Sequence, residues 1–370
     1  MSSETRVNEI FGTLHAMPEL GFTEHRTAAF LAEALTAAGY AVQTGIGGTG
    51  VVGTLAGAAE GPVVGLRADM DALPFVVDGR DVCRHACGHD AHSAMVLTAA
   101  EILAKTPPAR GTLKILFQPA EEVLTGALKV IESGAVDDLD ILFGIHLRPI
   151  QEARLGQATP ALRHGAITVV DATIAGAASH GARPHLGINA IDAAALAVNA
   201  VNAIRLDPAS AWSAKTTRLA AGGAAANIIP DRAEMIFDLR AQNNALMEEL
   251  LAKVGTAVSN AAAANGATAV VTPRGSVPAA EYDPVMTEIA REAIRAVLGD
   301  EGILPPIVTP GSEDFHFYVR KNPRLRPAYI GLGCDLKPGL HHPDMAFDVA
   351  ALPKGVAILV EAVRRAFAGA

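Results

Sequence analysis

The chain has 370 residues, of which half are apolar and 19% are charged, as is typical of a globular protein. This length exceeds one ordinary domain, so we expect two domains with a sizeable core. The formal charge of −9 is spread along the chain without a basic stripe, which argues against a nucleic-acid partner. No apolar run approaches membrane-spanning length, and the first residues lack the apolar segment of a signal peptide. Three cysteines cannot form a disulfide framework, so we expect a cytoplasmic protein.

The first part of the chain alternates helical and strand-like patterns. Helical patterns cover residues 8–17, 23–38, 93–105 and 126–133. Strand-like runs cover residues 51–55, 63–68, 112–118 and 139–147. Strands that alternate with helices predict an α/β fold, with a mainly parallel sheet covered by helices on both faces.

The pattern changes after residues 156–163. The following elements are a strand (166–175), a helix (189–205), two strands (215–220 and 232–240), a helix (244–265) and a strand (267–272). This β-α-β-β-α-β order predicts a ferredoxin-like domain. We expect it as an insertion at 163–273 in a first domain made of residues 1–162 and 274–370. That domain resumes with a helix at 285–298, a strand at 328–333 and a helix at 352–367.

Residues of the types that bind metals follow several strand-like runs. They are Asp69 and Asp71, Cys87 and His89, the pair Glu121-Glu122, His146, and the pair His341-His342. In an open α/β sheet, ligands bind outside the carboxyl ends of the strands, so these loops would converge on one site. A thiolate combined with imidazoles suits zinc, or manganese with mixed ligands. The pattern therefore indicates a metal-dependent hydrolase.

Several of these residues also have a simpler interpretation. Cys87 and His89 are two apart and point the same way in a loop before a helix that starts near Asp90, but a single cysteine is also a common core residue. One of Glu121 and Glu122 could bind metal while the other acts as general base, or both could be solvated carboxylates in a first helical turn. His146 could be a core histidine bonded to the backbone.

A glycine pattern at residues 45–50 has the Gly-x-Gly-x-x-Gly spacing of dinucleotide-binding loops. That function requires a helix to follow, whose N-terminus receives the pyrophosphate. A strand-like run at 51–55 follows instead, so we reject a nicotinamide-dependent enzyme.

The predicted inserted domain holds further candidates for substrate binding. His180 lies in a segment that joins a strand to a helix, and Asn227 lies in a glycine-rich turn. Asn227 and Arg240 could bind a carboxylate, the arginine through a bidentate fork. A surface arginine and a turn asparagine are the alternative.

Six motifs in this order resemble a known family. They are residues 66–74, 85–90, 117–122, 144–146, 312–315 and 340–343. The chain resembles, over nearly its whole length, the amidohydrolase branch of the metal-dependent aminoacylase and carboxypeptidase-G-type peptidases. That branch includes hippurate, indole-acetyl-amino-acid and aminobenzoyl-glutamate hydrolases. The resemblance implies a zinc-peptidase-like catalytic domain with an inserted lid and dimerisation domain.

The resemblance also assigns roles to individual residues. It implies a centre of two metal ions whose ligands are Cys87 as a bridge, His89, Glu122, His146 and His341. Glu121 is then the general base. Asp69 and Asp71 lie behind the ligands, where one of them could orient a ligand histidine.

For the inserted domain, the resemblance implies that His180 reaches the partner subunit's site and stabilises the oxyanion. Asn227 and Arg240 match positions that hold the substrate's carboxylate. Three features depart from the family pattern: Ala178-Ser179 replaces a Gly-Gly pair, Cys83 is unusual, and His164 lacks a common counterpart. They leave open the acyl preference and whether His164 or His342 touches substrate.

We therefore expect an enzyme that hydrolyses the amide bond of N-acyl amino acids or similar small conjugates with two Mn²⁺ or Zn²⁺ ions per subunit. We expect a homodimer that acts on small molecules and has neither a nucleic-acid nor a membrane partner. A dipeptidase or carboxypeptidase is the alternative enzyme. A catalytically inactive binding dimer is the alternative from another class.

Overall fold

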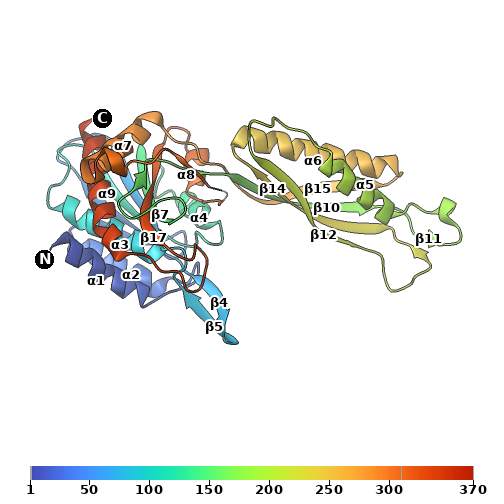
Figure 1. Cartoon of the computed structure of the whole chain (residues 1–370), viewed down its shortest axis with the longest axis horizontal. Coiled ribbons are helices and arrows are strands. Elements are labelled where there is room, and N and C mark those ends of the chain that lie inside the picture. Colours follow the sequence, from blue (N-terminus) through green and yellow to red (C-terminus); the bar gives the residue numbers. More distant parts are fainter. Residues whose placement is uncertain (1, 310, 370) are drawn as a thin grey trace. The chain divides into compact units, whose positions relative to one another are not determined.

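The structure is a computed structural model that describes residues 2–309 and 311–369, and the chain forms two compact units (Figure 1). Unit 1 contains residues 2–163, 281–309 and 313–369, and unit 2 contains residues 164–280 and 311–312. The insertion expected at 163–273 overlaps unit 2 over nearly its whole length. Among the described residues, no helix is both long enough and apolar enough to cross a lipid bilayer.

Unit 1 is built on a mixed sheet with the strand order β1-β2-β6-β3-β7-β17-β8. The strands are β1 (Ala41–Ile46), β2 (Gly50–Ala56), β3 (Val63–Asp69), β6 (Thr112–Gln118), β7 (Ile141–Pro149), β8 (Ala158–Thr159) and β17 (Arg326–Leu336). The central strands β6, β3, β7 and β17 are parallel, and the outer strands pair antiparallel. The mixed, mainly parallel α/β sheet predicted from the sequence is confirmed.

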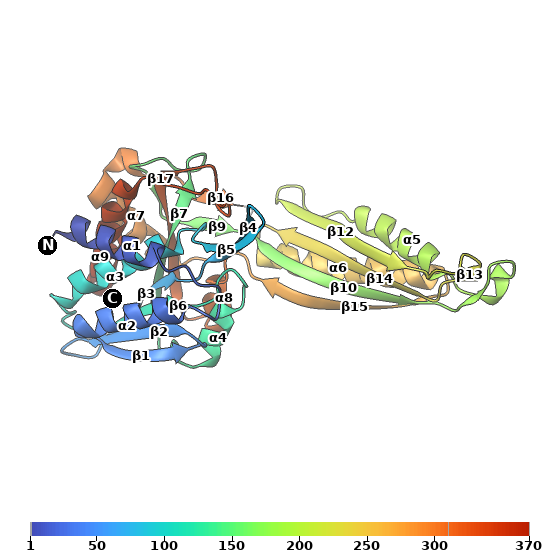
Figure 2. The ribbon, with the colours of Figure 1, turned by 90° about the horizontal axis from the view of Figure 1, so that it is seen from below.

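Helices cover both faces of this sheet (Figures 1 and 2). They are α1 (Ser3–His15), α2 (His25–Ala37), α3 (His89–Ala104), α4 (Gly126–Glu132), α7 (Pro284–Leu298), α8 (His316–Lys321) and α9 (Leu352–Ala368), with short 3₁₀ turns η2 (Asp300–Gly302) and η3 (Val349–Ala351). The connection from β3 to β6 and the one from β6 to β7 run in opposite directions across the sheet. Because parallel crossovers are right-handed, α3 and α4 lie on opposite faces.

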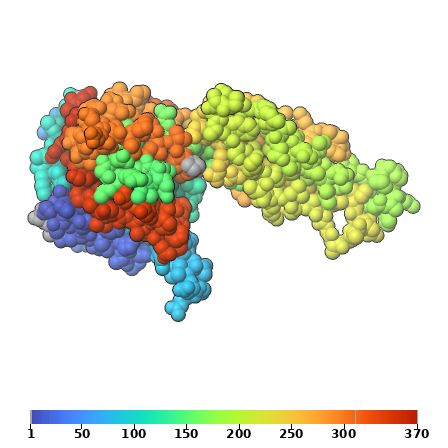
Figure 3. All heavy atoms as spheres, viewed as in Figure 1, coloured from blue at the N-terminus to red at the C-terminus, as the bar shows by residue number. Residues whose placement is uncertain are grey.

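Two small sheets complete unit 1. They are the hairpin of β4 (Leu73–Val77) and β5 (Arg80–Arg84), and the pair of β9 (Leu162–His164) and β16 (Ile307–Thr309). The hairpin, which was not predicted from the sequence, projects from the surface of unit 1 (Figure 3). Its turn contains Asp78 and Gly79, both with positive φ, which is the signature of a tight two-residue hairpin turn. Val76 beside this turn is 72% exposed.

Unit 2 has the element order β-α-β-β-α-β and a four-stranded antiparallel sheet with the order β12-β14-β10-β15. Its elements are β10 (Ala166–Ala175), α5 (Ala190–Asn202), β12 (Trp212–Ala221), β14 (Arg232–Ala241), α6 (Asn244–Ala264) and β15 (Thr268–Val277). Unit 2 also has a small sheet of β11 (Ser179–His180) and β13 (Ile228–Ile229), and the short turn η1 (Pro184–Leu186) follows β11. Met235, Phe237 and Leu239 alternate into the core of unit 2, as the sequence pattern predicted.

Candidate metal centre

Cys87 and His89 lie where the chain enters α3. Gly88 between them adopts a left-handed conformation with φ 92°, which favours glycine, and a Cβ there would lie 3.0 Å from Leu147. The helix starts at His89 rather than near Asp90, so our expectation that His89 lies in the preceding loop is wrong by one residue. The bent entry still brings the thiol and the imidazole to one place.

The first cluster of potential ligands consists of Cys87, His89 and His146, whose ligand atoms all lie within 4.8 Å of one another. The Cys87 Sγ is 3.5 Å from the His146 Nε2. His146 lies inside β7, not after it, and its Nδ1 is 2.6 Å from the Leu147 carbonyl oxygen. The backbone bond considered for a core histidine is therefore present, and it leaves Nε2 facing the thiol. A ligand histidine is commonly oriented in this way.

The second cluster shares the same thiol and consists of Cys87, Glu122 and His341. The His341 Nε2 is 3.4 Å from the Glu122 Oε2. His341 has a positive φ of 61°, and its backbone N–H donates to the Ala86 carbonyl at 2.7 Å. The structure thus brings together all five expected ligands, with Cys87 common to both clusters. His342 takes part in neither cluster; its Nδ1 accepts from the backbone N–H of Asp344.

The chemistry of these groups fits divalent metal ions. The His89 Nε2 and the Glu122 Oε1 are buried 3.8 Å apart, and among the described residues neither has a hydrogen-bond partner. Burial without a partner is costly, and a cation between the two atoms would remove that cost. Burial lowers the pKa of His146, which favours the neutral imidazole that can bind metal. Burial and the charge of Glu122 raise the pKa of the Cys87 thiol well above its usual range, so a bound cation would be needed to hold it as the thiolate.

Two aspartates at the end of β3 orient the histidines. The Asp71 Oδ1 is 3.0 Å from the His89 Nδ1, and the Asp71 Oδ2 accepts from the backbone N–H of Glu122 at 3.0 Å. The Asp69 Oδ1 is 2.7 Å from the Nδ1 of His92, whose Nε2 accepts from the Leu147 N–H. His92 was not predicted as a functional residue, although its spacing of three from His89 on a helix was an available signal.

Glu121 is buried beside the ligands. Its Oε2 is 3.8 Å from the His89 Nε2, and a carboxylate oxygen lies within 4.8 Å of oxygens of Glu313 and Asp314. Burial and then the charges of Glu313 and Asp314 raise the pKa of Glu121 well above its usual value. A carboxylate with a raised pKa is suited to accept and return a proton near neutral pH.

A fully buried arginine holds the carboxylates behind Glu121. The Arg67 guanidinium donates to Asp69 at 2.7 Å, to Glu313 at 3.0 Å and to Asp314 at 3.1 Å. Its Nε donates to Gln118 at 2.9 Å, and its Nη1 donates to the Tyr329 hydroxyl at 3.1 Å. This network connects the ends of β3 and β6 with the segment before α8. No role for Arg67 was predicted from the sequence.

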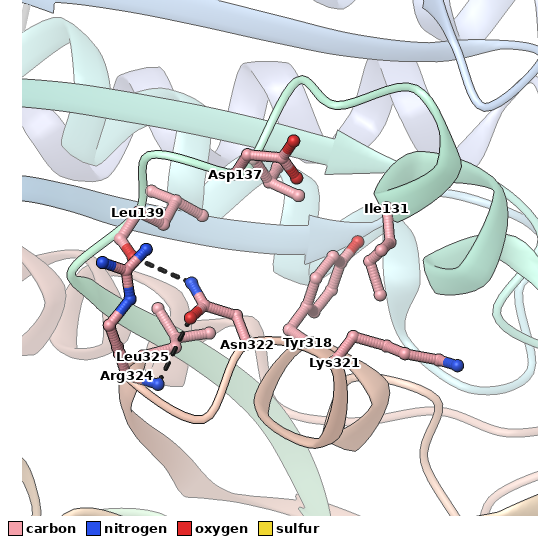
Figure 4. Close-up of a pocket in the computed structure, with 9 residues that line it drawn as sticks. Ile131, Asp137, Leu139, Tyr318, Lys321, Asn322, Arg324 and Leu325 are labelled. Carbon is pink, nitrogen blue, oxygen red and sulfur yellow. Dashed lines mark hydrogen bonds between the residues drawn. The ribbon is translucent and has the colours of Figure 1, made fainter.

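A separate pocket of about 250 Å³ lies near α4 and α8 (Figure 4). The Asn322 side chain at its edge donates to the Leu139 carbonyl and accepts from the backbone N–H of Arg324. Tyr318 forms part of the lining and donates its hydroxyl hydrogen to Gln118 at 3.0 Å. None of the five expected ligands lines this pocket, so we do not assign it to the metal centre.

In unit 2 the expected substrate-binding residues occupy two places. His180 in β11 and Asn227 before β13 are exposed neighbours, because the Gly181 N–H donates to the Asn227 carbonyl at 2.7 Å. Arg240 lies near the C-terminal end of β14, whereas Asn227 precedes the start of that strand. The Arg240 side chain is exposed and donates to Asp238 at 2.9 Å. His164 is buried.

Comparisons with known proteins agree with this arrangement. Residues 65–365 match the model of peptidase family M20/M25/M40. The chain is 30% identical to an N-acetyl-L-cysteine deacetylase of Bacillus subtilis, over 95% of this chain and 86% of that protein. It is 33% identical to an IAA-amino acid hydrolase of Arabidopsis thaliana, over 84% of this chain and 73% of that protein. The solved structure of a dinuclear metal-binding peptidase from Bacillus subtilis matches with a TM-score of 0.84 and 27% identity, covering 99% of both chains. This chain belongs to peptidase family M20/M25/M40.

Proposed function

We propose that the chain hydrolyses the amide bond of N-acyl amino acids or similar small conjugates, releasing a free amino acid and a carboxylic acid. The observation that carries this proposal is the Cys87 thiol shared by two ligand clusters, with the buried carboxylate of Glu121 beside them. Two relatives are named for the cleavage of an acetyl-amino acid and of an amino acid conjugate, which supports this substrate class.

In this proposal, Cys87, His89, Glu122, His146 and His341 hold two divalent ions, either Mn²⁺ or Zn²⁺. When bound, the ions would polarise the substrate carbonyl and acidify a water molecule. Glu121 accepts a proton from the attacking water at its carboxylate and returns it to the leaving amine. His180 donates a hydrogen bond to the oxyanion that develops on the carbonyl oxygen.

We further propose that unit 2 is a ferredoxin-like lid and dimerisation domain. Asn227 precedes the start of β14 at Arg232, whereas Arg240 lies near the end of that strand. The stretch from Arg232 to Arg240 spans roughly 25 Å at about 3.3 Å per strand residue, so Asn227 and Arg240 are far apart. One substrate carboxylate cannot contact both residues of the same chain. A homodimer in which the partner supplies His180 and Asn227 would resolve this difficulty, and light scattering tests the dimer. The cytoplasmic location stays a prediction.

A dipeptidase or carboxypeptidase would use the same metal chemistry and differ only in the acyl pocket. A catalytically inactive binding dimer is disfavoured because such a protein has no use for Glu121 beside the ligand clusters.

The test is a panel of acetyl-, benzoyl- and indole-acetyl-amino acids and dipeptides, assayed with Mn²⁺ and Zn²⁺. We expect cleavage of at least one acyl-amino acid, its loss on chelation, and its return when the metal is added back. Glu121→Gln should lower kcat by several orders of magnitude while two ions per chain remain bound. A near-normal kcat in this variant would refute the role of Glu121, and preferential cleavage of dipeptides would favour the peptidase alternative.

A further inference from the structure

The segment that carries Glu121 and Glu122 has a strained backbone. Ala120 and Leu124 on either side have positive φ values of 55° and 57°, which cost roughly 1–2 kcal/mol for a residue with a Cβ. The loop also closes tightly, because a Cβ at Gly126 would lie 1.7 Å from the Pro119 carbonyl oxygen. Such a conformation persists only when neighbouring groups hold it.

Two buried carboxylates hold this segment on opposite sides of Glu121. The Asp71 Oδ2 accepts from the Glu122 N–H at 3.0 Å, and the Glu24 Oε1 accepts from the Ala120 N–H at 2.8 Å. Glu24 is 0% exposed, and its Oε2 accepts from the hydroxyl of Thr49 at 2.5 Å. The backbone N–H groups of Ala120 and Glu122, the residues on either side of Glu121, are therefore fixed by side chains from distant segments.

The position of Glu24 is not explained by helix capping. Glu24 is the N-cap residue of α2, yet its side chain makes no capping bond. Glu19 caps the helix instead, because its carboxylate accepts from the backbone N–H groups of Arg26 and Thr27 at 3.0 and 2.9 Å. Burying a carboxylate is costly, so the inward orientation of Glu24 points to a role at Ala120.

We propose that Glu24 is a positioning residue for Glu121. By holding the Ala120 peptide, it sets the direction in which the Glu121 side chain leaves the backbone and therefore where the proton is accepted. The turn that carries Glu24 supports the same contact, because a Cβ on Gly21 would lie 3.1 Å from the Cα and Cβ of Ala120. This inference rests on the proposed function, since it takes Glu121 as the general base.

The test compares Glu24→Gln with Glu24→Met. Both remove the charge and nearly conserve the volume, but only glutamine keeps an oxygen that can accept from the Ala120 N–H. We expect kcat of the Met variant to fall about 10- to 100-fold, since an error of about 1 Å in a catalytic group costs up to that much. Its KM should stay within about threefold, with two ions per chain retained, and the Gln variant should keep kcat within about threefold of wild type.

Two further variants keep the test decisive. Glu24→Asp keeps a carboxylate but shortens its reach, and it should lower kcat about tenfold even if the Met variant fails to fold. Thr49→Val removes the other partner of Glu24 and leaves the Ala120 bond, so it should keep kcat within about threefold of wild type. A folded, metal-loaded Met or Asp variant with the kcat of wild type would overturn the proposal.

Hydrogen exchange separates this proposal from the proposed function. In metal-free protein, the amides of residues 120–126 should exchange faster in the Met variant than in the Gln variant, and equal rates would overturn the positioning role. If instead wild type cleaves no amide in the panel, or Glu121→Gln keeps its kcat, the proposed function fails. The exchange result still decides whether Glu24 holds the loop.

Discussion

Asp71 provides a direct test of how the candidate ligands are held, because its two oxygens serve two of them. One oxygen lies against the His89 Nδ1, and the other accepts from the Glu122 N–H. In Asp71→Asn, one oxygen becomes an amide NH₂ group that cannot accept a hydrogen bond. Whichever way the amide turns, one of the two partners faces a donor.

The loss can be estimated from the hydrogen bond that is removed. A bond to a charged acceptor contributes about 1.5–3 kcal/mol. This corresponds to a factor of roughly 10 to 150 in metal affinity, since each 1.36 kcal/mol is tenfold. Outer partners of metal ligands typically contribute a factor of about 10 to 100. We therefore expect the Kd for Mn²⁺ or Zn²⁺ to rise at least tenfold in the variant.

Calorimetric titration of metal-free protein measures this Kd directly, and kcat/KM at saturating metal gives a second measurement. Asp81→Asn is a matched control, because Asp81 is exposed on the β4–β5 hairpin. It should change neither quantity. A folded Asp71→Asn variant whose Kd and kcat/KM both stay within about twofold of wild type would refute the proposed orientation of His89 and Glu122.

Three further predictions concern stability. Arg67→Met should destabilise unit 1 by about 3–5 kcal/mol in urea denaturation, because it leaves three buried carboxylates without their cation, and a loss below about 1 kcal/mol would contradict this. The hydrogen bond to Asp90 raises the pKa of His15, so this pair stabilises the fold below pH of about 6.5 and loses that contribution as pH rises through the raised value. His15→Ala should therefore lower the free energy of unfolding more at pH 5.5 than at pH 9. The difference between the two losses should be less than about 1 kcal/mol because the imidazole is half exposed. Equal losses at the two pH values would refute the reasoning. Gly255→Ala in α6 adds a Cβ that meets no atom within 4 Å, so it should stabilise unit 2 by about 0.5–1 kcal/mol, and a lower thermal midpoint would argue against this.

The strands that hold the candidate site were predictable because they are buried in a parallel sheet. Such strands form continuous apolar runs, and those at 63–68, 112–118 and 139–147 correspond to β3, β6 and β7. The β4–β5 hairpin was missed because its strands are short and only partly buried, so their apolar residues form no extended pattern. The Asp78-Gly79 turn was the remaining signal.

The candidate ligands were predictable from residue type, position after strands and family motifs. Residues that act through distant neighbours were not predictable in this way. Glu24 meets Ala120 across 96 residues of sequence, and locally it looks like an ordinary residue at the start of a helix. Arg67 likewise looks like a charge that interrupts a buried strand until Glu313 and Asp314 are placed against it. Their roles depend on tertiary contacts that no local pattern contains.

The pairing of β7 with β17 has a consequence for biosynthesis. β7 is almost fully buried, but its parallel neighbour β17 follows only after residues 150–325 have been made. At roughly 5–20 residues per second, the edge of β7 that β17 will cover remains open on the ribosome for about 10–35 s. His341 emerges later still, so a nascent chain holds a thiol and two imidazoles before the last expected ligand exists. The complete set of expected ligands therefore exists only after the C-terminal part has emerged, and the edge of β7 exposes unpaired backbone N–H and C=O groups during that interval.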